Sequence, residues 1–208
     1  MSEAAIVILA AGMSRRLGRP KQVLPLAGEP IIAHVGRAAR ASSASRVMAV
    51  IGGARHQTMG ALDGIVDELV INDSYSQGQG TSIAAAIRHL QSTQHILGPC
   101  EAVVFLLADQ PGIQTATIDS VIDAWRNGGK IVTAEYRDQP GHPVLFDQAY
   151  WPDLSRLDGD QGGRVIISKH PREVVRVPVD TDSPMDVDTE ADWRILQEHW
   201  PNQEPVTE

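Results

Sequence analysis

The fold class is decided by residues 5–10, AIVILA, and by the residues that follow them, 11–21, AGMSRRLGRPK. The first six are apolar without alternation, which is typical of a strand covered on both faces of a sheet. Similar runs recur with helical segments between them: the runs are residues 46–51, 68–71 and 102–107, and the helical segments are residues 31–41, 81–90 and 115–125. Strands that alternate with helices at this spacing predict an α/β fold with a mostly parallel sheet.

The second half of the chain continues this pattern with shorter elements. Residues 131–135, 144–146 and 174–177 are expected to form strands, and residues 190–200 a closing helix. The Thr81-Ser82 pair is expected to cap the helix that it opens. We expect residues 1–200 to form one domain and residues 201–208 a frayed tail. In folds of this kind the ligand crevice lies beyond the carboxyl ends of the strands.

Composition excludes several classes of protein. The chain carries 18 Lys+Arg and 26 Asp+Glu for a net charge of −8, and only 4% of its residues are aromatic, which argues against a general nucleic-acid binder. It has no apolar run near the ~20 residues that cross a bilayer, and no signal peptide is expected before the first strand. Cys100 is the single cysteine, so a reducing cytoplasm is the expected compartment.

The loop after the first strand combines small residues with cations. Ala10, Ala11 and Gly12 allow a ligand close to backbone N–H groups, which can hold phosphate oxygens. Four cations follow within seven residues: Arg15, Arg16, Arg19 and Lys21. The spacing is neither that of a Walker loop nor that of GxGxxG. A solvated basic loop is the plain alternative, but the position directly after a buried strand favours a polyphosphate site.

This loop resembles the signature LAAGxSxRxGxxK of nucleotidyltransferases that act on the molybdenum cofactor and of related cytidylyltransferases. The matching residues are Ala10, Ala11, Gly12, Ser14, Arg16, Gly18 and Lys21. The resemblance implies a three-layer, Rossmann-like nucleotidyltransferase fold. It also implies that Gly12 and its neighbours hold the triphosphate of a nucleotide, while Arg16 and Lys21 neutralise it in catalysis.

A second glycine-containing segment, residues 72–82, precedes a helix. By itself it indicates little more than a flexible loop and a helix cap, although free helix N–H groups suit a phosphate or a base edge. It resembles the family segment NxxxxxGxxxS through Asn72, Gly78 and Ser82, which implies contacts to the nucleotide base. Ala11 stands where the guanylyltransferases usually carry a second glycine, so the resemblance favours CTP over GTP.

Carboxylates end the strand at 102–107 and precede the closing helix. Asp109 at the exit of a buried strand suits a hard divalent cation, although a turn cap is the ordinary alternative. Asp186 and Asp188 share one face of an extended segment and repel unless a cation lies between them. Thr189 and Asp192 are instead explained as a capping box.

Both carboxylate segments resemble family elements. Residues 106–111 are similar to LLADQP, whose Asp binds magnesium, and this match implies that Asp109 is both a metal ligand and a catalytic residue. Residues 186–192 are similar to DIDTPED, with Glu190 in place of Pro. We therefore expect Mg²⁺ to be bound by Asp109 and Asp188, with Asp186 in support.

Two further segments resemble acceptor-side elements of the family. Residues 141–146 resemble GHPxLF, and residues 159–164 resemble GDxGAR, which makes His142, Asp160 and Arg164 candidate contacts to the acceptor. Pro140 replaces an arginine that is common in the family. A histidine satisfied within the fold, and a structural pair of Asp160 with Arg164, remain open as alternatives.

The function implied by the resemblance is Mg²⁺-dependent transfer of CMP from CTP to molybdopterin cofactor, with release of pyrophosphate. The expected partners are these two substrates and a molybdenum hydroxylase apoenzyme, with neither nucleic acid nor membrane. One alternative is a guanylyltransferase, or a cytidylyltransferase on another phosphorylated acceptor. Another is a non-catalytic molybdenum cofactor chaperone, for which Lys21 and the two metal-site carboxylates would be unnecessary.

Overall fold

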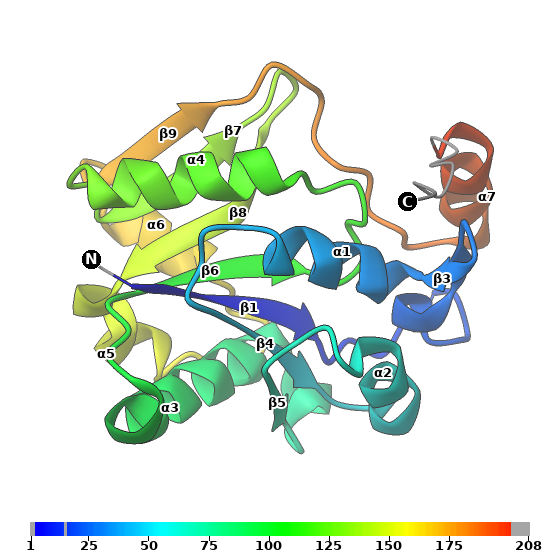
Figure 1. The fold of residues 1–208 in the computed structure, drawn as a ribbon, viewed down its shortest axis with the longest axis horizontal. Helices are drawn as coiled ribbons and strands as arrows, with labels where there is room; N and C mark the ends of the chain where they lie inside the picture. The colour runs from blue at the N-terminus through cyan, green and yellow to red at the C-terminus, as the bar shows by residue number, and fades with distance from the viewer. Residues whose placement is uncertain (1–2, 15, 201–208) are drawn as a thin grey trace, which may run out of the picture.

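A seven-stranded sheet forms the middle layer of the computed structural model, which describes residues 3–14 and 16–200 (Figure 1). In spatial order the strands are β5 (Glu68–Ile71), β4 (Arg46–Ile51), β1 (Ala4–Ala10), β6 (Ala102–Leu107), β8 (Pro140–Asp147), β7 (Ile131–Glu135) and β9 (Val174–Pro178). Only β8 runs antiparallel to its two neighbours in the described sheet. The prediction of a mostly parallel sheet is therefore confirmed.

The exceptional strand, β8, is longer than the sequence predicts. It begins at Pro140, whereas the apolar run begins only at Val144. The connection from β7 is a few residues long, which allows an antiparallel neighbour but not a parallel one. The early part of β8 brings His142 level with the ends of the parallel strands, beside Phe105 of β6.

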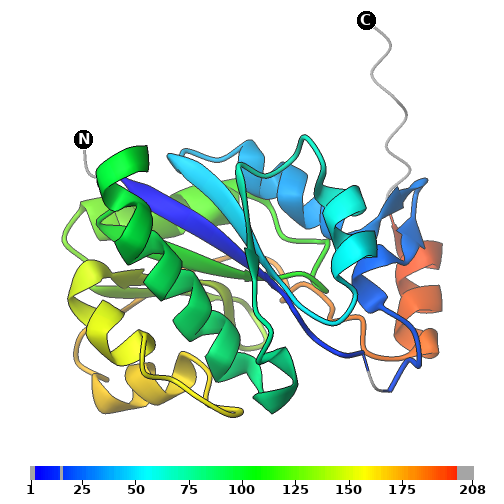
Figure 2. The same ribbon diagram turned by 90° about the horizontal axis from the view of Figure 1, so that it is seen from below.

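Helices cover both faces of the sheet, so the molecule has three layers (Figures 1 and 2). One face is covered by α1 (Ile31–Arg40), α2 (Arg55–Leu62) and α4 (Thr115–Arg126). The other face is covered by α3 (Gln79–Leu97), α5 (Trp151–Leu154) and α6 (Arg164–Lys169). Alternate residues of β1 enter the two cores, with Ile6 and Ile8 on one side and Val7 on the other. This two-sided burial explains the continuous apolar run.

Three details correct the sequence-based predictions. The third helix begins at Gln79, and its N-cap is Gly78, so Thr81 lies inside the first turn and does not cap the helix. The Thr81 hydroxyl instead donates to the carbonyl of Gly78 or of Ser74. Helices α2, α5 and α6 were not predicted, because α2 lacks a clear apolar face and the other two have only four and six residues.

The closing helix α7 (Glu190–His199) packs outside the main sheet, against the small hairpin of β2 (Pro25–Leu26) and β3 (Glu29–Pro30). Its first turn carries the predicted capping box, in which the Thr189 hydroxyl accepts from the Asp192 N–H and the Asp192 carboxylate accepts from the Thr189 N–H. The predicted tail, residues 201–208, lies outside the described residues. Within residues 3–14 and 16–200, each helix is too short or too polar to cross a bilayer.

Candidate active site

A cavity of about 310 Å³ opens where β1 and β6 end, between the loop after β1 and the start of α3. Predicted site residues that line it come from all three segments: Ala11, Gly12, Lys21, Gly78, Ser82 and Asp109. Tyr75 and Gln79 complete the α3 side. We refer to this space as the nucleotide cavity. Its place at the carboxyl ends of parallel strands is where α/β folds bind ligands.

The loop that borders the nucleotide cavity is shaped by Gln22, a residue outside the motifs recognised in the sequence. Its side chain is 2% exposed, and its amide nitrogen donates to the carbonyls of Ala10 and Gly12, both at 3.0 Å. The Ser14 hydroxyl accepts from the Lys21 N–H at 3.0 Å. The Ala10 carbonyl and the Ser14 hydroxyl therefore make hydrogen bonds that hold the loop itself. The signal for Gln22 was only its position directly after Lys21.

Gly12 leaves room on the side where a ligand would lie. A Cβ built on Gly12 would have its nearest neighbour, the Gln22 amide nitrogen, at 4.0 Å. The protein itself therefore does not require glycine at this position. The open space next to the backbone suits close approach by a ligand.

Lys21 brings together two carboxylates that are far apart in the sequence. Its ammonium group contacts Asp109, and it donates to Asp188 Oδ1 at 2.9 Å. Arg16 pairs with the other oxygen of Asp188 at 2.7 Å, although the arginine side chain is 69% exposed. Arg15 lies outside the described residues. Lys21, Arg16 and the two aspartates thus form one charged cluster, of which Lys21 and Asp109 line the nucleotide cavity.

The pKa values in this cluster follow from partial burial and from the neighbouring charges. Burial lowers the pKa of Lys21, but Asp109 and Asp188 outweigh it, so the net shift is upward. Burial raises the pKa of Asp188, but Lys21 and Arg16 outweigh it and lower the net value. At neutral pH the cluster therefore holds charged groups of both signs.

Asp186 is next to this cluster but is held by a different partner. Its carboxylate accepts from the Gln110 amide at 2.9 Å, and burial together with the charge of Asp109 raises its pKa. Between Asp186 and Asp188 the side chain of Val187 is fully buried, and its N–H donates to the Asp109 carbonyl at 3.1 Å. That backbone bond fixes the segment against the end of β6.

The carboxylate oxygens of Asp109 and Asp188 suit a hard divalent cation only when a bound substrate supplies further oxygen ligands. Asp109 and Asp188 provide carboxylate oxygens around one cationic group, which is Lys21 in this structure. Among the described residues there is no group of three or more His, Cys, Asp or Glu side chains placed to hold a metal. Mg²⁺ is typically held by one or two carboxylates together with substrate phosphates and water. The two aspartates therefore fit a metal that arrives with a nucleotide.

The structure corrects the predicted role of Asn72. The side chain is buried and does not line the nucleotide cavity. Its amide nitrogen donates to the hydroxyls of Thr81 and Ser82 at 2.9 and 3.0 Å, and its oxygen accepts from the Ser74 N–H. These bonds use both N–H groups of the amide and one acceptor site of its oxygen. Asn72 therefore positions the start of α3 in place of the predicted contact with a base.

Gly78 is required by close packing against the loop at residues 158–163. Its φ is +127°, and a Cβ there would lie 2.2 Å from the backbone of Gly159. The Gly80 N–H donates to the Gly159 carbonyl at 2.9 Å. The start of α3 is thus joined to the segment that carries Asp160 and Arg164.

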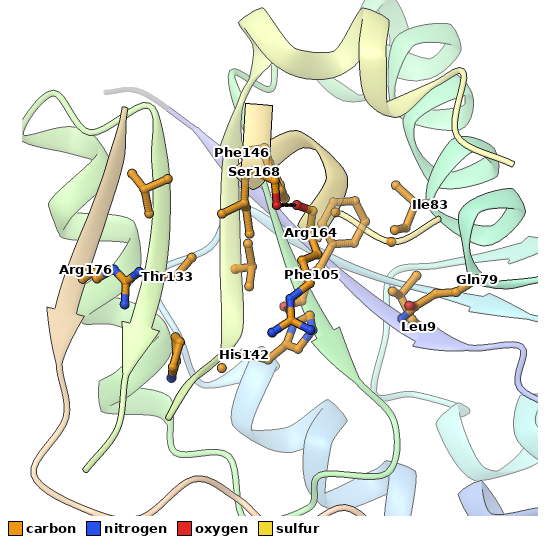
Figure 3. Close-up of a pocket in the computed structure, with 17 residues that line it drawn as sticks. Leu9, Gln79, Ile83, Phe105, Thr133, His142, Phe146, Arg164, Ser168 and Arg176 are labelled. Carbon is orange, nitrogen blue, oxygen red and sulfur yellow. Dashed lines mark hydrogen bonds between the residues drawn. The ribbon is translucent and has the colours of Figure 1, made fainter. Parts of the chain in front are cut away.

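A second cavity of about 380 Å³ lies beside the first, between α6 and the sheet face of β6, β8, β7 and β9 (Figure 3). We refer to it as the acceptor cavity. Leu9 and Gln79 line both cavities, so the two spaces adjoin. Its body is mostly apolar, formed by residues such as Phe105, Val144 and Phe146. Ligand pockets commonly have this character, with a few polar groups that orient the ligand.

His142 and Arg164 are the predicted residues that line the acceptor cavity (Figure 3). The His142 Nδ1 lies 3.0 Å from the Phe105 carbonyl, which can only accept, so Nδ1 carries the proton. Burial lowers the pKa of His142 and favours the neutral ring, whose Nε2 is then an acceptor. His142 is thus both held by the fold and available to a ligand.

The alternative pairing of Asp160 with Arg164 does not occur. Asp160 is exposed, lies outside the acceptor cavity and forms no ion pair with Arg164. Among the described residues the Arg164 guanidinium has no carboxylate partner. Thr133 and Arg176 also line the acceptor cavity, and the sequence analysis missed both, since neither lies in a recognisable motif.

A family model and a characterised relative each match most of the chain. The family described as MobA-like NTP transferase domain matches residues 6–174. Nicotine blue oxidoreductase of Paenarthrobacter nicotinovorans is 30% identical over 201 residues, which cover 91% of this chain and 95% of that protein.

Solved structures agree with the sequence relationship. The crystal structure of the Mycobacterium tuberculosis Rv0371c homologue from Mycobacterium sp. strain JC1 is 32% identical, with a TM-score of 0.79 over 94% of this chain and 95% of the other. The structure of Rv0371c of Mycobacterium tuberculosis H37Rv in complex with manganese is 29% identical, with a TM-score of 0.76, over 95% of this chain and 100% of the other.

Proposed function

Because the chain belongs to the family of MobA-like NTP transferase domains and is a nucleotidyltransferase, we propose that it transfers CMP from CTP to molybdopterin cofactor. The products are the cytosine dinucleotide form of the cofactor and pyrophosphate. The observation that carries the proposal is the pair of adjoining cavities that share Leu9 and Gln79. One of them is bordered by the glycine loop, Lys21 and Asp109, and the other is a mostly apolar space next to it.

The nucleotide cavity supports a distinct role for each part of its wall. Gly12 and Ala11 admit the triphosphate to the loop backbone, whose shape Gln22 maintains. Gly78 and Ser82 at the start of α3 face the base side of the same space. The preference for CTP rests on Ala11, where related guanylyltransferases carry glycine.

Asp109 and Asp188 are the residues that would hold Mg²⁺ together with nucleotide phosphate oxygens. The metal would supply positive charge next to the phosphates while they react. With metal and nucleotide bound, Lys21 would donate to phosphate oxygens in place of the two carboxylates. Rv0371c, a relative by structure, was solved with manganese, which supports a divalent metal without identifying it.

Transfer requires the phosphate of the acceptor to lie in line with the α-phosphate of CTP. The shared wall at Leu9 and Gln79 supports this meeting point, because a ligand in either cavity can reach it. Arg16 and Lys21 neutralise charge on the triphosphate, and His142 and Arg164 orient the acceptor. The reaction is a direct displacement without a covalent enzyme intermediate, in which catalysis comes from positioning and charge.

The experiment that tests the proposal is an incubation of the protein with each NTP, Mg²⁺ and molybdopterin cofactor. We expect pyrophosphate release with CTP and a product whose mass equals the cofactor plus CMP. Release with GTP, or only with another phosphorylated acceptor, would support the alternative transferases. Binding of nucleotide and cofactor without pyrophosphate would support a chaperone for a molybdenum hydroxylase. The single cysteine continues to favour a cytoplasmic setting.

A first prediction concerns the charged cluster. Asp109→Ala and Lys21→Ala are each expected to lower the rate of pyrophosphate release by ~10²–10³, because each removes a preorganised charge next to the reacting phosphates. The matched control is Asp180→Ala, which removes a 95% exposed carboxylate paired with Arg137 at the surface. Near-normal turnover in either site variant would contradict the mechanism, provided that circular dichroism shows a native fold.

A further inference from the structure

The acceptor cavity extends across several strands of the sheet. Leu9, at the wall shared with the nucleotide cavity, lies on β1, and Arg176 lies on β9. The strand order β1-β6-β8-β7-β9 separates these two positions by four strand steps. At about 4.8 Å a step, their backbones are roughly 19 Å apart along the sheet. His142 on β8 lies about halfway between them.

The charged side chains that line this cavity are both arginines. Arg164 approaches from α6 and Arg176 from β9, so the two guanidinium groups come from different walls (Figure 3). Among the described residues that line the cavity there is no Asp or Glu. This contrasts with the net charge of −8 on the whole chain. The cavity therefore favours a ligand with electron-rich groups in more than one place.

Arg176 is held in position at the end of the cavity far from Leu9. Its guanidinium pairs with Glu135 of β7 at 2.7 Å, and Glu135 itself does not line the cavity. Thr133 is the register partner of Arg176 on the neighbouring strand, and its side chain lies on the same face of the sheet. This far end thus presents the remaining N–H groups of an exposed arginine, oriented by its pair with Glu135, together with a threonine hydroxyl.

We infer that Arg176 is a specificity residue, which recognises the end of the acceptor that lies far from the reacting phosphate. The inference rests on the proposed function, since the phosphate must lie at the wall shared by Leu9 and Gln79. The acceptor is then an extended molecule with three parts. Its phosphate lies at the shared wall, a flat apolar ring fills the body of the cavity, and an edge of hydrogen-bond acceptors meets Arg176. A compact sugar phosphate ends before it reaches this residue.

The chemistry of an arginine fits an acceptor edge better than an isolated charge. The planar guanidinium presents parallel N–H donors, which match a ring carbonyl next to a ring nitrogen. The Thr133 hydroxyl adds one more donor or acceptor. Glu135 accepts from only one nitrogen of the guanidinium group, so further N–H groups of Arg176 stay available to a ligand.

The test uses 6-carboxypterin, a fluorescent bicyclic ring with a carboxylate on its pyrazine ring and a fused pyrimidinone ring, whose carbonyl oxygen and ring nitrogens include hydrogen-bond acceptors. Its binding to the full chain is measured by fluorescence, with ribose 5-phosphate as a compact competitor. Arg176→Gln is expected to weaken pterin binding by about tenfold or more, as expected for loss of a matched polar contact, while the affinity for CTP with Mg²⁺ stays unchanged. Arg176→Lys is expected to restore only part of the binding.

The matched control is Arg172→Gln, which removes an exposed arginine that does not line the cavity. Pterin binding that is equal in wild type and Arg176→Gln would overturn the inference, as would equal displacement by ribose 5-phosphate and by unlabelled pterin. Pterin binding that depends on Arg176, without pyrophosphate release from any NTP, would refute the proposed transfer but support recognition by Arg176. Pyrophosphate release that is insensitive to Arg176→Gln at low acceptor concentration would support the transfer and overturn the inference.

Discussion

Lys21 stands between Asp109 and Asp188, and this arrangement sets the electrostatics of the site. Two partly buried carboxylates that contact the same ammonium group would repel each other without that cation between them. Lys21 supplies that cation in the protein alone, with Arg16 on the outer oxygen of Asp188. A metal-bound triphosphate offers the aspartates another cation and offers Lys21 another anion. The same three residues can therefore stabilise both the free and the loaded site.

Gln22 holds the shape of the loop after β1 through its two hydrogen bonds to loop carbonyls. Gln22→Leu is expected to leave the carbonyls of Ala10 and Gly12 without their donor, at a cost of about 1–3 kcal/mol in the free energy of unfolding. The affinity for CTP is expected to fall as well, because the loop loses its fixed shape. Urea unfolding and a CTP titration measure the two effects. Gln91→Leu, on an exposed position of α3, is the control and should change neither.

His142 predicts how stability depends on pH. Burial lowers the pKa of His142 in the folded protein, whereas the unfolded chain has the ordinary value. Above the ordinary value both states are neutral and the residue contributes no pH dependence. As the pH falls below about 6.5, the unfolded chain binds a proton that the folded protein does not, so stability decreases.

The measurement is urea unfolding of wild type and of His142→Gln at about pH 7.5 and at about pH 5.5, on either side of the ordinary histidine value. The wild type is expected to lose more stability between the two conditions than the variant does. An equal loss in both proteins would show that His142 is protonated to the same extent in the folded and unfolded states.

At the scale of elements, the start of α3 connects the two cavities. Gly78 and Gln79 belong to the nucleotide cavity, and the backbone of Gly78 and Gly80 packs directly on the loop that leads to Arg164. A movement of this loop would therefore displace the acceptor side and the nucleotide side together. This contact explains why a glycine is needed where the sequence indicated only a flexible turn.

Helix α7 contacts the end of the loop after β1 and the hairpin that follows it. The Trp193 indole donates to the Pro25 carbonyl at 3.0 Å, and the Arg19 guanidinium lies 4.8 Å from the centre of its ring. Arg19 also pairs with Glu190 at 2.7 Å. The end of the loop after β1 is thus held by the first turns of α7. These turns directly follow the segment that carries Asp188.

Trp193→Ala is therefore expected to raise the KM for CTP by roughly tenfold, which corresponds to the loss of a cation–π contact and one hydrogen bond. The kcat should change less, because Lys21, Asp109 and Asp188 are retained. Steady-state pyrophosphate release measures both constants. Gln197→Ala, at an exposed position of the same helix, is the control. A KM equal to that of wild type would show that α7 does not position the loop.

At the scale of the whole molecule, the nucleotide cavity brings together segments from most of the chain. Residues from the β1 loop, the start of α3 and the end of β6 all line the nucleotide cavity, and the segment before α7 adds Asp188. A ligand that binds only the folded state stabilises it by about 2.7 kcal/mol at a hundred times its Kd. For a domain of about 200 residues, we expect this to raise Tm by about 5–11 °C.

Thermal unfolding with CTP, with and without Mg²⁺, measures this shift. The increase is expected to be largest with both present, and to shrink when a chelator removes the metal or when Asp109→Asn removes a ligand. A shift of the same size with the chelator present would show that the nucleotide binds without a metal.

The sequence predicted the parallel half of the sheet with almost no error in its boundaries. The strands at 46–51, 68–71 and 102–107 coincide with β4, β5 and β6, because strands covered on both faces need continuous apolar runs. It also placed Asp109 at a strand exit and the capping box at Thr189. Short helices such as α6 were not predictable, since six residues contain too little periodicity to be distinguished from a turn.

The sequence by itself therefore determined the α/β class, the alternation of strands and helices along the chain, and the segments proposed to contact phosphate, metal and acceptor. Those features depend on neighbouring residues or on motifs of fixed spacing. Only the tertiary structure decided that Lys21 lies between Asp109 and Asp188, that the Asn72 amide bonds to the start of α3, and that Arg176 lines the acceptor cavity. Such contacts join residues far apart in the chain, and they arise only when the strands and helices pack.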